Sequence, residues 1–185
     1  MAHTRHVSLP RLGVGGTLLL GVAALALLAT QPSVRADRYS VYDGDTLEVI
    51  PGKCLLAHFH LPCLAQRLRL HGVDAFERHQ NCRDVDGKLW PCGDVATARL
   101  KQLVAAPDFH CQVNENFVDR HAREFAVCLS DGKDVGTILV SEGLAFAYGR
   151  RTRYVEIEAE ARREHRGAWA GTFVRPQFYR AGARE

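Results

Sequence analysis

The sequence predicts an α+β domain in which a small β-barrel carries helices packed at its ends. Two observations support this class. Segments with strand composition occur three times before the first helical segment and twice after it, and two more helical segments follow, in the order β-β-β-α-β-β-α-α. A hydrophobic fraction of 46% over 185 residues is enough for one core of ordinary size. We therefore expect one folded domain with an appendage.

The first strands are predicted on both sides of a turn signal. Residues 38–50 are rich in β-forming residues and end at Pro51-Gly52. Residues 66–75 alternate as a strand does, with Arg69 on the polar face. The polar stretch 78–92 predicts a loop.

The helices are predicted from apolar spacing and from capping residues. Residues 94–105 carry apolar residues at helical spacing, and Asp94 is expected to be the N-cap. Residues 135–145 predict a helix that stops at Gly143. The remaining expected elements are strands near 108–115 and 123–130, a turn at Asp131-Gly132, and a charged helix over 154–167.

The appendage is predicted at the N-terminus. An apolar run at 12–29 follows basic residues, and no Asp or Glu precedes Asp37. This pattern is typical of a secretory signal, here cleaved after Ala36. An uncleaved membrane anchor is the alternative, because the run is about long enough for a thin span. Both predict an exported domain that is periplasmic, secreted or membrane-anchored. The predicted parts are 1–36 (signal or anchor), 37–173 (domain) and 174–185 (C-terminal tail).

The charge of the exported part differs from that of the whole chain. Three of the 24 Lys and Arg residues lie before residue 37, which leaves 21 basic against 21 acidic residues. A neutral domain has no global attraction for a polyanion. Any contact with nucleic acid must therefore come from a local cluster of basic side chains.

The cysteine count predicts disulfides. All six cysteines follow residue 37, and an even number in an exported domain is typical of a disulfide framework. Neighbouring cysteines flank loops or strand-like runs, which favours sequential pairing. A zinc site is the alternative at the first pair, where His58 and His60 stand between the two cysteines. The predicted bridges are Cys54–Cys63, Cys82–Cys92 and Cys111–Cys128.

The stretch Asp43-Gly44-Asp45 is compatible with two local structures. Asp-Gly between β-rich flanks predicts a tight hairpin turn. Two carboxylates so close together repel each other, and a bound cation would offset that repulsion. The turn alone does not decide between a plain hairpin and half of a cation site.

Several motifs in fixed order resemble the staphylococcal-nuclease-like (thermonuclease) family. They are "DGDT", "RLHGVDAFE", "DRHAREFAVCLSDGKDVGTILVSEGLA" and "GAWAG", and the resemblance covers residues 38–172. It implies a five-stranded OB-like barrel with about three helices. It also implies a calcium-dependent phosphodiesterase that cuts DNA and RNA and leaves 3′-phosphate products.

The resemblance also implies the roles of individual residues in a Ca²⁺ site. Asp45 and Asp74 would be direct ligands, the backbone carbonyl of Ala75 a third, and Asp43 a ligand through water. Hard oxygen donors of this kind are those that Ca²⁺ prefers.

The catalytic roles follow from the same resemblance. Glu77 would activate the attacking water, while Arg69 and Arg123 would hold the phosphate and neutralise its developing charge. The pattern departs at Phe76, where the family often has proline.

Further contacts to a nucleic acid substrate are implied at three positions. Arg120 and His121 would contact a terminal phosphate, and the Tyr148 ring would stack on a base. We expect a monomer whose partner is DNA or RNA. A weak or inactive binding or scaffold module is the alternative function.

Overall fold

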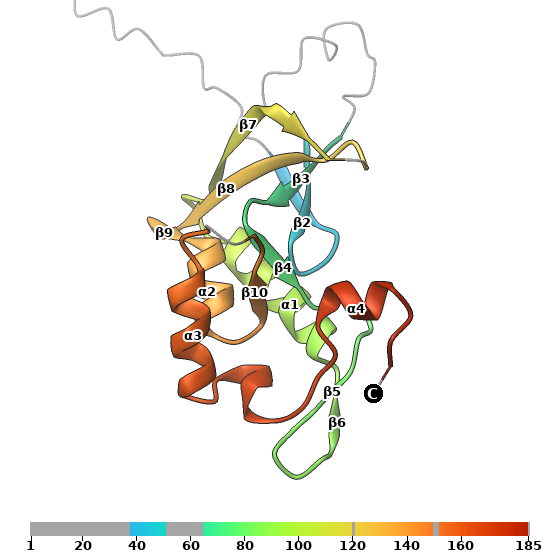
Figure 1. Ribbon diagram of the computed structural model, residues 1–185. Helices are drawn as coiled ribbons and strands as arrows, with labels where there is room; N and C mark the ends of the chain where they lie inside the picture. The colour runs from blue at the N-terminus through green and yellow to red at the C-terminus, as the bar shows by residue number, and fades with distance from the viewer. Residues whose placement is uncertain (1–37, 51–64, 120, 150–151, 185) are drawn as a thin grey trace, which may run out of the picture. The chain divides into compact units, whose positions relative to one another are not determined.

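A curled sheet forms the barrel part of the computed structural model, which describes residues 38–50, 65–119, 121–149 and 152–184 (Figure 1). Five strands follow one another in the order β1-β2-β3-β8-β7, and β9 extends the sheet beside β8. Neighbouring strands are antiparallel except β3 and β8, which run parallel. The bounds are β1 (Arg38–Val41), β2 (Thr46–Ile50), β3 (Gln66–Leu70), β7 (His110–Val118), β8 (Glu124–Ser130) and β9 (Lys133–Asp134).

Two small sheets complete the strands of the described residues. β4 (Val73–Ala75) pairs with β10 (Ala145–Ala147), and β5 (Cys82–Arg83) pairs with β6 (Leu89–Trp90). The single strand predicted over 66–75 was therefore wrong. It breaks at Gly72, whose φ of +74° belongs to the left-handed region and turns the chain from β3 into β4. The loop predicted over 78–92 contains the β5–β6 hairpin.

Four α-helices lie beside these sheets in the described part of the chain: α1 (Cys92–Val104), α2 (Val135–Ser141), α3 (Val155–Arg163) and α4 (Pro176–Arg180). The expected stop after α2 is confirmed, since Gly143 has a φ of +69°. The charged helix is shorter than predicted and is followed by a 3₁₀ turn, Gly167–Ala170. A fourth helix, α4, lies in the segment predicted as a tail.

The predicted N-cap of the first helix was wrong. α1 begins at Cys92, two residues earlier, so Asp94 lies inside its first turn. The Asp94 carboxylate accepts a hydrogen bond from the backbone N–H of His79 instead. An acidic residue is favourable anywhere in the first turn, because the exposed N–H groups there carry partial positive charge. An acidic residue in the sequence therefore does not show whether it is the N-cap or lies inside the first turn of the helix.

The main core lies between the curled sheet and helices α1 and α2. Aliphatic side chains dominate it, and each contributes on the order of 1.5–3 kcal/mol when fully removed from water. The fully buried members include Leu47, Leu68, Val73, Leu100, Val135 and Leu139. This core packs against one face of β2, β3 and β8. Several predicted site residues lie on these strands or next to them.

A second, smaller cluster is aromatic. Phe76 is buried and meets the rings of Phe146 and Phe173 edge to face, at centroid distances of 5.0 and 5.6 Å. Trp169 closes the cluster against Phe146 and Phe173. Such pairs contribute about 0.5–1.5 kcal/mol beyond burial. The cluster joins the segment after β4 to the segment that leads into α4.

Two predicted disulfides are formed in the structure. Cys82–Cys92 joins β5 to the start of α1, and Cys111–Cys128 joins the paired strands β7 and β8. The predicted Cys54–Cys63 bridge and the alternative zinc site lie outside the described residues, as does the apolar run at 12–29. The described residues contain no helix long and apolar enough to span a membrane.

Candidate active site

The turn between β1 and β2 places its acidic residues against β4. The backbone N–H of Asp45 donates to Oδ1 of Asp43 at 3.1 Å, which stabilises the turn. A Cβ atom at Gly44 would lie 2.7 Å from Cβ of Ala75. Only glycine allows so close an approach, and it brings Asp45 into reach of the β4 backbone. The stretch is therefore a hairpin turn that also positions a carboxylate.

The Asp45 carboxylate is buried and held from several directions. Its Oδ2 accepts a hydrogen bond from the backbone N–H of Ala75 at 2.9 Å, and its Oδ1 accepts from the Thr46 hydroxyl at 3.0 Å. Arg69 donates from Nη1 to Oδ1 at 3.1 Å. The β2–β3 register pairs Thr46 with Arg69, so this contact follows from strand pairing.

Arg69 bridges two buried carboxylates. Its Nη2 lies 3.0 Å from Oδ2 of Asp45 and 2.7 Å from Oδ1 of Asp74, which β4 supplies. Burial raises the pKa of Asp45 to about 7, although the Arg69 charge lowers it, and the charges of Asp43 and Asp74 raise it further. Negative charge is thus costly at Asp45, and additional positive charge nearby would stabilise the ionised form.

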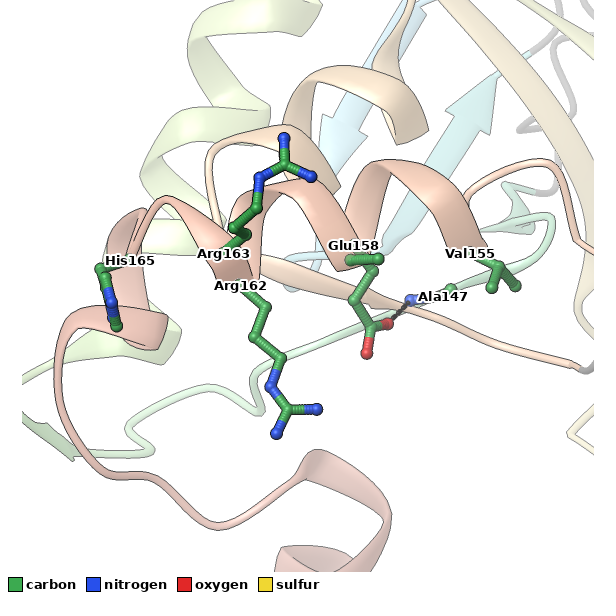
Figure 2. Close-up of a pocket in the computed structure, with 7 residues that line it drawn as sticks. Ala147, Val155, Glu158, Arg162, Arg163 and His165 are labelled. Carbon is green, nitrogen blue, oxygen red and sulfur yellow. Dashed lines mark hydrogen bonds between the residues drawn. The ribbon is translucent and has the colours of Figure 1, made fainter.

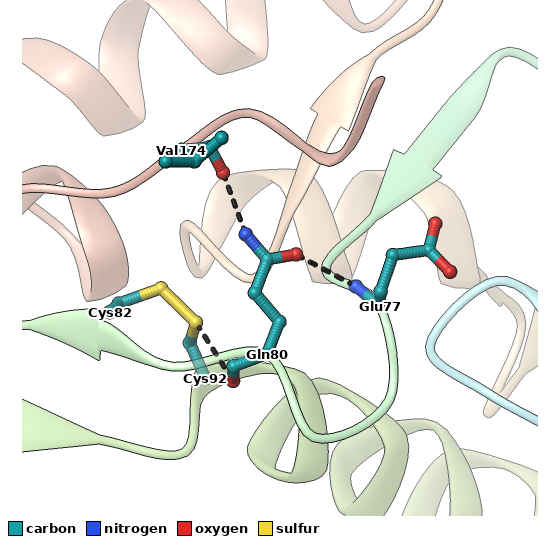
Figure 3. The surroundings of a disulfide bond; sticks show 5 residues. All are labelled: Glu77, Gln80, Cys82, Cys92 and Val174. Atoms are coloured by element: carbon teal, nitrogen blue, oxygen red, sulfur yellow. Dashed lines mark hydrogen bonds between the residues drawn. A yellow bond between two sulfur atoms is a disulfide. The ribbon is translucent and has the colours of Figure 1, made fainter. Parts of the chain in front are cut away.

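Glu77 lies in the loop after β4, and the backbone of that loop is tightly packed. A Cβ at Gly93 would come within 1.8 Å of the Glu77 carbonyl oxygen, so the start of α1 requires glycine. The Gln80 side chain accepts a hydrogen bond from the Glu77 N–H at 3.1 Å (Figure 3). Sγ of Cys92 lies 3.4 Å from the Gln80 carbonyl oxygen. The disulfide and Gln80 together hold the backbone of Glu77.

Arg123 is fixed from the opposite side of the pocket. It precedes β8 and donates from Nε to Oδ2 of Asp119 at 2.8 Å and from Nη1 to the Thr46 hydroxyl at 3.2 Å. Partial burial alone would raise the pKa of Asp119. Hydrogen bonds from the Arg123 side chain and from the backbone N–H groups of Arg123 and His121 lower this pKa to about 2. The guanidinium of Arg123 is therefore held by a carboxylate that stays ionised.

These side chains meet at a pocket of about 610 Å³. Four arginines, three acidic residues and three aromatic rings are among the residues that line it. Tyr148 is half exposed there, with the centre of its ring 6.0 Å from the Arg69 guanidinium carbon. Arg120 lies outside the described residues. The predicted site residues that line the pocket are Asp43, Arg69, Glu77, His121, Arg123 and Tyr148.

Six residues that line the pocket were not predicted: Tyr42, Thr46, Arg67, Asp119, Phe125 and Arg180. Arg180, the last residue of α4, donates to Oδ1 and Oδ2 of Asp74 at 3.0 and 3.2 Å and to Oε1 of Glu77 at 2.5 Å. The sequence has no local signal for this contact, because 103 residues separate Arg180 from Glu77. The ion pairs do reveal that Asp74 and Glu77 face one another across a single guanidinium group.

A family model described as staphylococcal nuclease homologue matches residues 67–171, more than half of the chain. The chain belongs to this family. It is also similar to a succinoglycan biosynthesis protein, ExoI, from Rhizobium meliloti (strain 1021). The two are 29% identical over 167 residues, which cover 86% of this chain and 79% of that protein.

Membership of the staphylococcal nuclease homologue family indicates nuclease-type phosphodiesterase activity and nucleic acid binding in general. The α+β fold with its curled OB-like sheet agrees with this family. The two disulfides are compatible with a periplasmic or extracellular location.

The site contains two carboxylates of the kind that coordinate calcium in proteins. Asp45 and Asp74 are buried, share Arg69, and lie beside the backbone of Ala75. The described residues contain no cluster of three or more His, Cys, Asp or Glu side chains placed to hold a metal. A calcium ion at this place would have Asp45 and Asp74 as carboxylate ligands, and its other ligands would have to be backbone carbonyls or water.

A second pocket, of about 560 Å³, lies along α3 and contains none of the predicted site residues (Figure 2). Its carboxylate, Glu158, accepts a hydrogen bond from the backbone N–H of Ala147 at 2.6 Å and pairs with Arg175 at 2.6 Å. Both oxygens of Glu158 thus have structural partners. This pocket offers no group that is arranged for phosphodiester chemistry.

Proposed function

We propose that this protein is an exported, calcium-dependent nuclease that hydrolyses phosphodiester bonds of DNA, RNA or both. The observation that carries the proposal is the meeting of Glu77 with Arg69 and Arg123 at one pocket, where Arg69 also pairs with the buried carboxylates Asp45 and Asp74. A carboxylate opposite two phosphate-binding guanidinium groups is the arrangement that attack by water on phosphorus needs.

The residues of the chain divide the work as follows. Arg69 and Arg123 donate hydrogen bonds to the non-bridging oxygens of the phosphate and hold it for in-line attack. Glu77 accepts the proton of the attacking water while the new P–O bond forms. The bond to the 5′-oxygen breaks, and that oxygen takes a proton from solvent, which leaves a 3′-phosphate as the family resemblance implies. A calcium ion bound at Asp45, Asp74 and the Ala75 carbonyl would neutralise charge that builds on the phosphate.

Substrate contacts beyond the reacting phosphate come from the rim of the pocket. His121 lines the pocket and would contact a terminal phosphate, and the half-exposed Tyr148 ring would stack on a base. The exported part is formally neutral, so binding would depend on this local set of cations and would weaken with salt.

The test is cleavage of single-stranded DNA and RNA oligonucleotides by the purified protein, with calcium and with chelator. We expect cleavage only with calcium, and products with 3′-phosphate ends by mass spectrometry. Glu77→Gln should reduce kcat by roughly 10²–10⁴-fold because it removes the proton acceptor. Glu156→Gln, an exposed position on α3, is the matched control and should retain wild-type activity. Cleavage that is equally fast with calcium and with chelator, and equally fast in the wild type and in Glu77→Gln, would refute the proposal.

A binding or scaffold module remains the second candidate, and one observation favours it. Arg180 engages both Asp74 and Glu77, the two carboxylates that the reaction would use. Tight binding of oligonucleotides without turnover, in calcium and across several other divalent cations, would support this candidate over the nuclease.

A further inference from the structure

The segment that carries Arg180 is built firmly into the fold. The Gln80 side chain donates to the Val174 carbonyl oxygen at 2.7 Å, and Arg175 pairs with Glu158 at 2.6 Å (Figure 3 shows the first contact). Phe173 packs into the aromatic cluster, and Pro176, buried, begins α4. α4 therefore presents its last residue to the pocket through contacts that do not depend on Arg180 itself.

Arg180 occupies the oxygen atoms that a cation would need. Its two terminal nitrogens bind both oxygens of Asp74, and Nη1 also binds Glu77. Partial burial would lower the pKa of Arg180, but hydrogen bonds to Asp74 and Glu77 and their charges raise it above its usual value. The guanidinium stays charged, and a calcium ion can bind to Asp74 only where this guanidinium has moved away.

The two arginines on Asp74 differ in how easily they can leave. The Arg69 side chain is 10% exposed and is enclosed by two carboxylates, whereas the Arg180 side chain is 39% exposed and extends from a helix end into the pocket. Asp74 itself is buried at 5% exposure, but water reaches the Arg180 guanidinium directly, so Arg180 is the easier of the two arginines to displace. Rotation of the Arg180 side chain would free Asp74 and Glu77 without moving α4.

We propose that Arg180 is an inhibitory residue, which competes with the divalent cation for Asp74 and covers Glu77 until the cation binds. This inference rests on the proposed calcium-dependent nuclease. The apparent calcium affinity would equal the intrinsic affinity multiplied by the fraction of molecules in which Arg180 has left Asp74. Arg180 would thus set the calcium concentration at which the enzyme becomes active.

The experiment is calorimetric titration of calcium into the wild-type protein and into Arg180→Ala. We expect calcium to bind about tenfold more tightly to the variant, since the competing guanidinium is gone. Arg180→Met, which keeps much of the aliphatic side chain, should give the same gain and guards against a folding defect. Thermal unfolding with chelator checks that each variant is folded.

Two controls separate competition from a general change in charge. Arg67→Ala removes a positive charge from the same pocket, but Arg67 pairs with Glu48 rather than with Asp74 or Glu77. Arg184→Ala removes a charge from the same C-terminal segment, where Arg184 contacts backbone carbonyl oxygens. Both should change calcium affinity by less than about threefold, as expected for screened charges.

Cleavage assays distinguish failure of this inference from failure of the proposed function. At saturating calcium we expect Arg180→Ala to cleave at a rate close to that of the wild type, with the calcium midpoint shifted to lower concentration. Calcium-dependent cleavage by the wild type, with calcium affinity unchanged or weaker in Arg180→Ala, would overturn the competition alone. A large loss of kcat at saturating calcium would also overturn it, by placing Arg180 on the substrate. If calcium binds neither to the wild type nor to any of the variants, both proposals are overturned.

Discussion

The two sides of the pocket are built in different ways. On the sheet side, Asp45, Arg69 and Arg123 sit on or next to β2, β3 and β8, whose backbones pair along the curled sheet. On the loop side, Glu77 and Arg180 lie outside any strand. Their positions depend on Gln80, a disulfide and the aromatic cluster. Strand pairing distributes its support over many bonds, while the loop side relies on a few specific contacts.

This difference has a consequence for mutation. Substitutions on the sheet side should cost stability, because the charges there are buried and mutually paired. Substitutions that remove the contacts holding the loop side should lower catalytic activity, and they should lower stability less than substitutions on the sheet side do. Each prediction below tests one part of this comparison, from the largest expected effect to the smallest.

Arg69→Met should destabilise the protein by roughly 3–5 kcal/mol, because it leaves the buried carboxylates Asp45 and Asp74 without their shared cation. The loss should be greater at pH 8 than at pH 5, since burial raises the pKa of Asp45 to about 7 and its protonation at low pH removes one of the buried negative charges. Urea unfolding measures both effects. Arg67→Met, on the same strand but facing solvent, is the matched control and should cost less than about 1 kcal/mol. Equal losses in the two variants would contradict this account of the sheet side.

The two described disulfides should affect function unequally. Replacing either pair by alanine should cost about 2–4 kcal/mol of stability, because each bridge restricts the conformations of the unfolded chain. Loss of Cys82–Cys92 should also reduce kcat more than tenfold, since this bridge holds the Gln80 and Glu77 backbone. Loss of Cys111–Cys128 should leave kcat near the wild-type value, because β7 and β8 are already paired by backbone hydrogen bonds. Unfolding and cleavage assays at a temperature where both variants are folded will compare them.

Gln80→Met should loosen the loop that carries Glu77 while keeping a side chain of similar volume. It removes the hydrogen bonds to Glu77 N–H and to the Val174 carbonyl, at a cost of about 1–3 kcal/mol. Because Gln80 positions Glu77 rather than touching substrate, kcat should fall while KM stays nearly constant. Gln102→Met, at an exposed position on α1, is the control. A proportional change in KM, or no change in kcat, would argue against a positioning role.

The smallest expected effect is a pH dependence at Asp119. Its pKa of about 2 in the folded protein lies below the ordinary value of 3.8, so its ionised form stabilises the fold. This stabilisation is fully present above about pH 4 and is lost as pH falls through 2. The free energy of unfolding of the wild type should therefore exceed that of Asp119→Asn by about 1–2 kcal/mol at pH 6, and this difference should shrink toward pH 2. Unfolding by guanidinium chloride between pH 2 and pH 6 measures this stability difference. A difference that does not change with pH would rule out a contribution from the ionisation of Asp119.

Local patterns in the sequence determined the fold class, the family resemblance, two described disulfides and half of the residues that line the pocket. Apolar spacing and strand alternation are short-range properties, and motif order places Asp45, Arg69, Asp74 and Glu77 relative to strands and turns. Some errors concerned boundaries, such as the break at Gly72, where one residue with positive φ splits a strand that alternation alone makes continuous. The sequence patterns also missed two whole elements, the β5–β6 hairpin and helix α4.

The tertiary structure alone showed that the segment predicted as a C-terminal tail reaches the site. Gln80 contacts Val174 across 94 residues and Arg180 contacts Glu77 across 103, and such distances leave no periodicity or spacing to detect. The aromatic cluster that makes these contacts possible combines rings from three separate segments of the chain. Contacts of this kind depend on which surfaces meet after the core has formed, so they follow from packing rather than from any local pattern of residues.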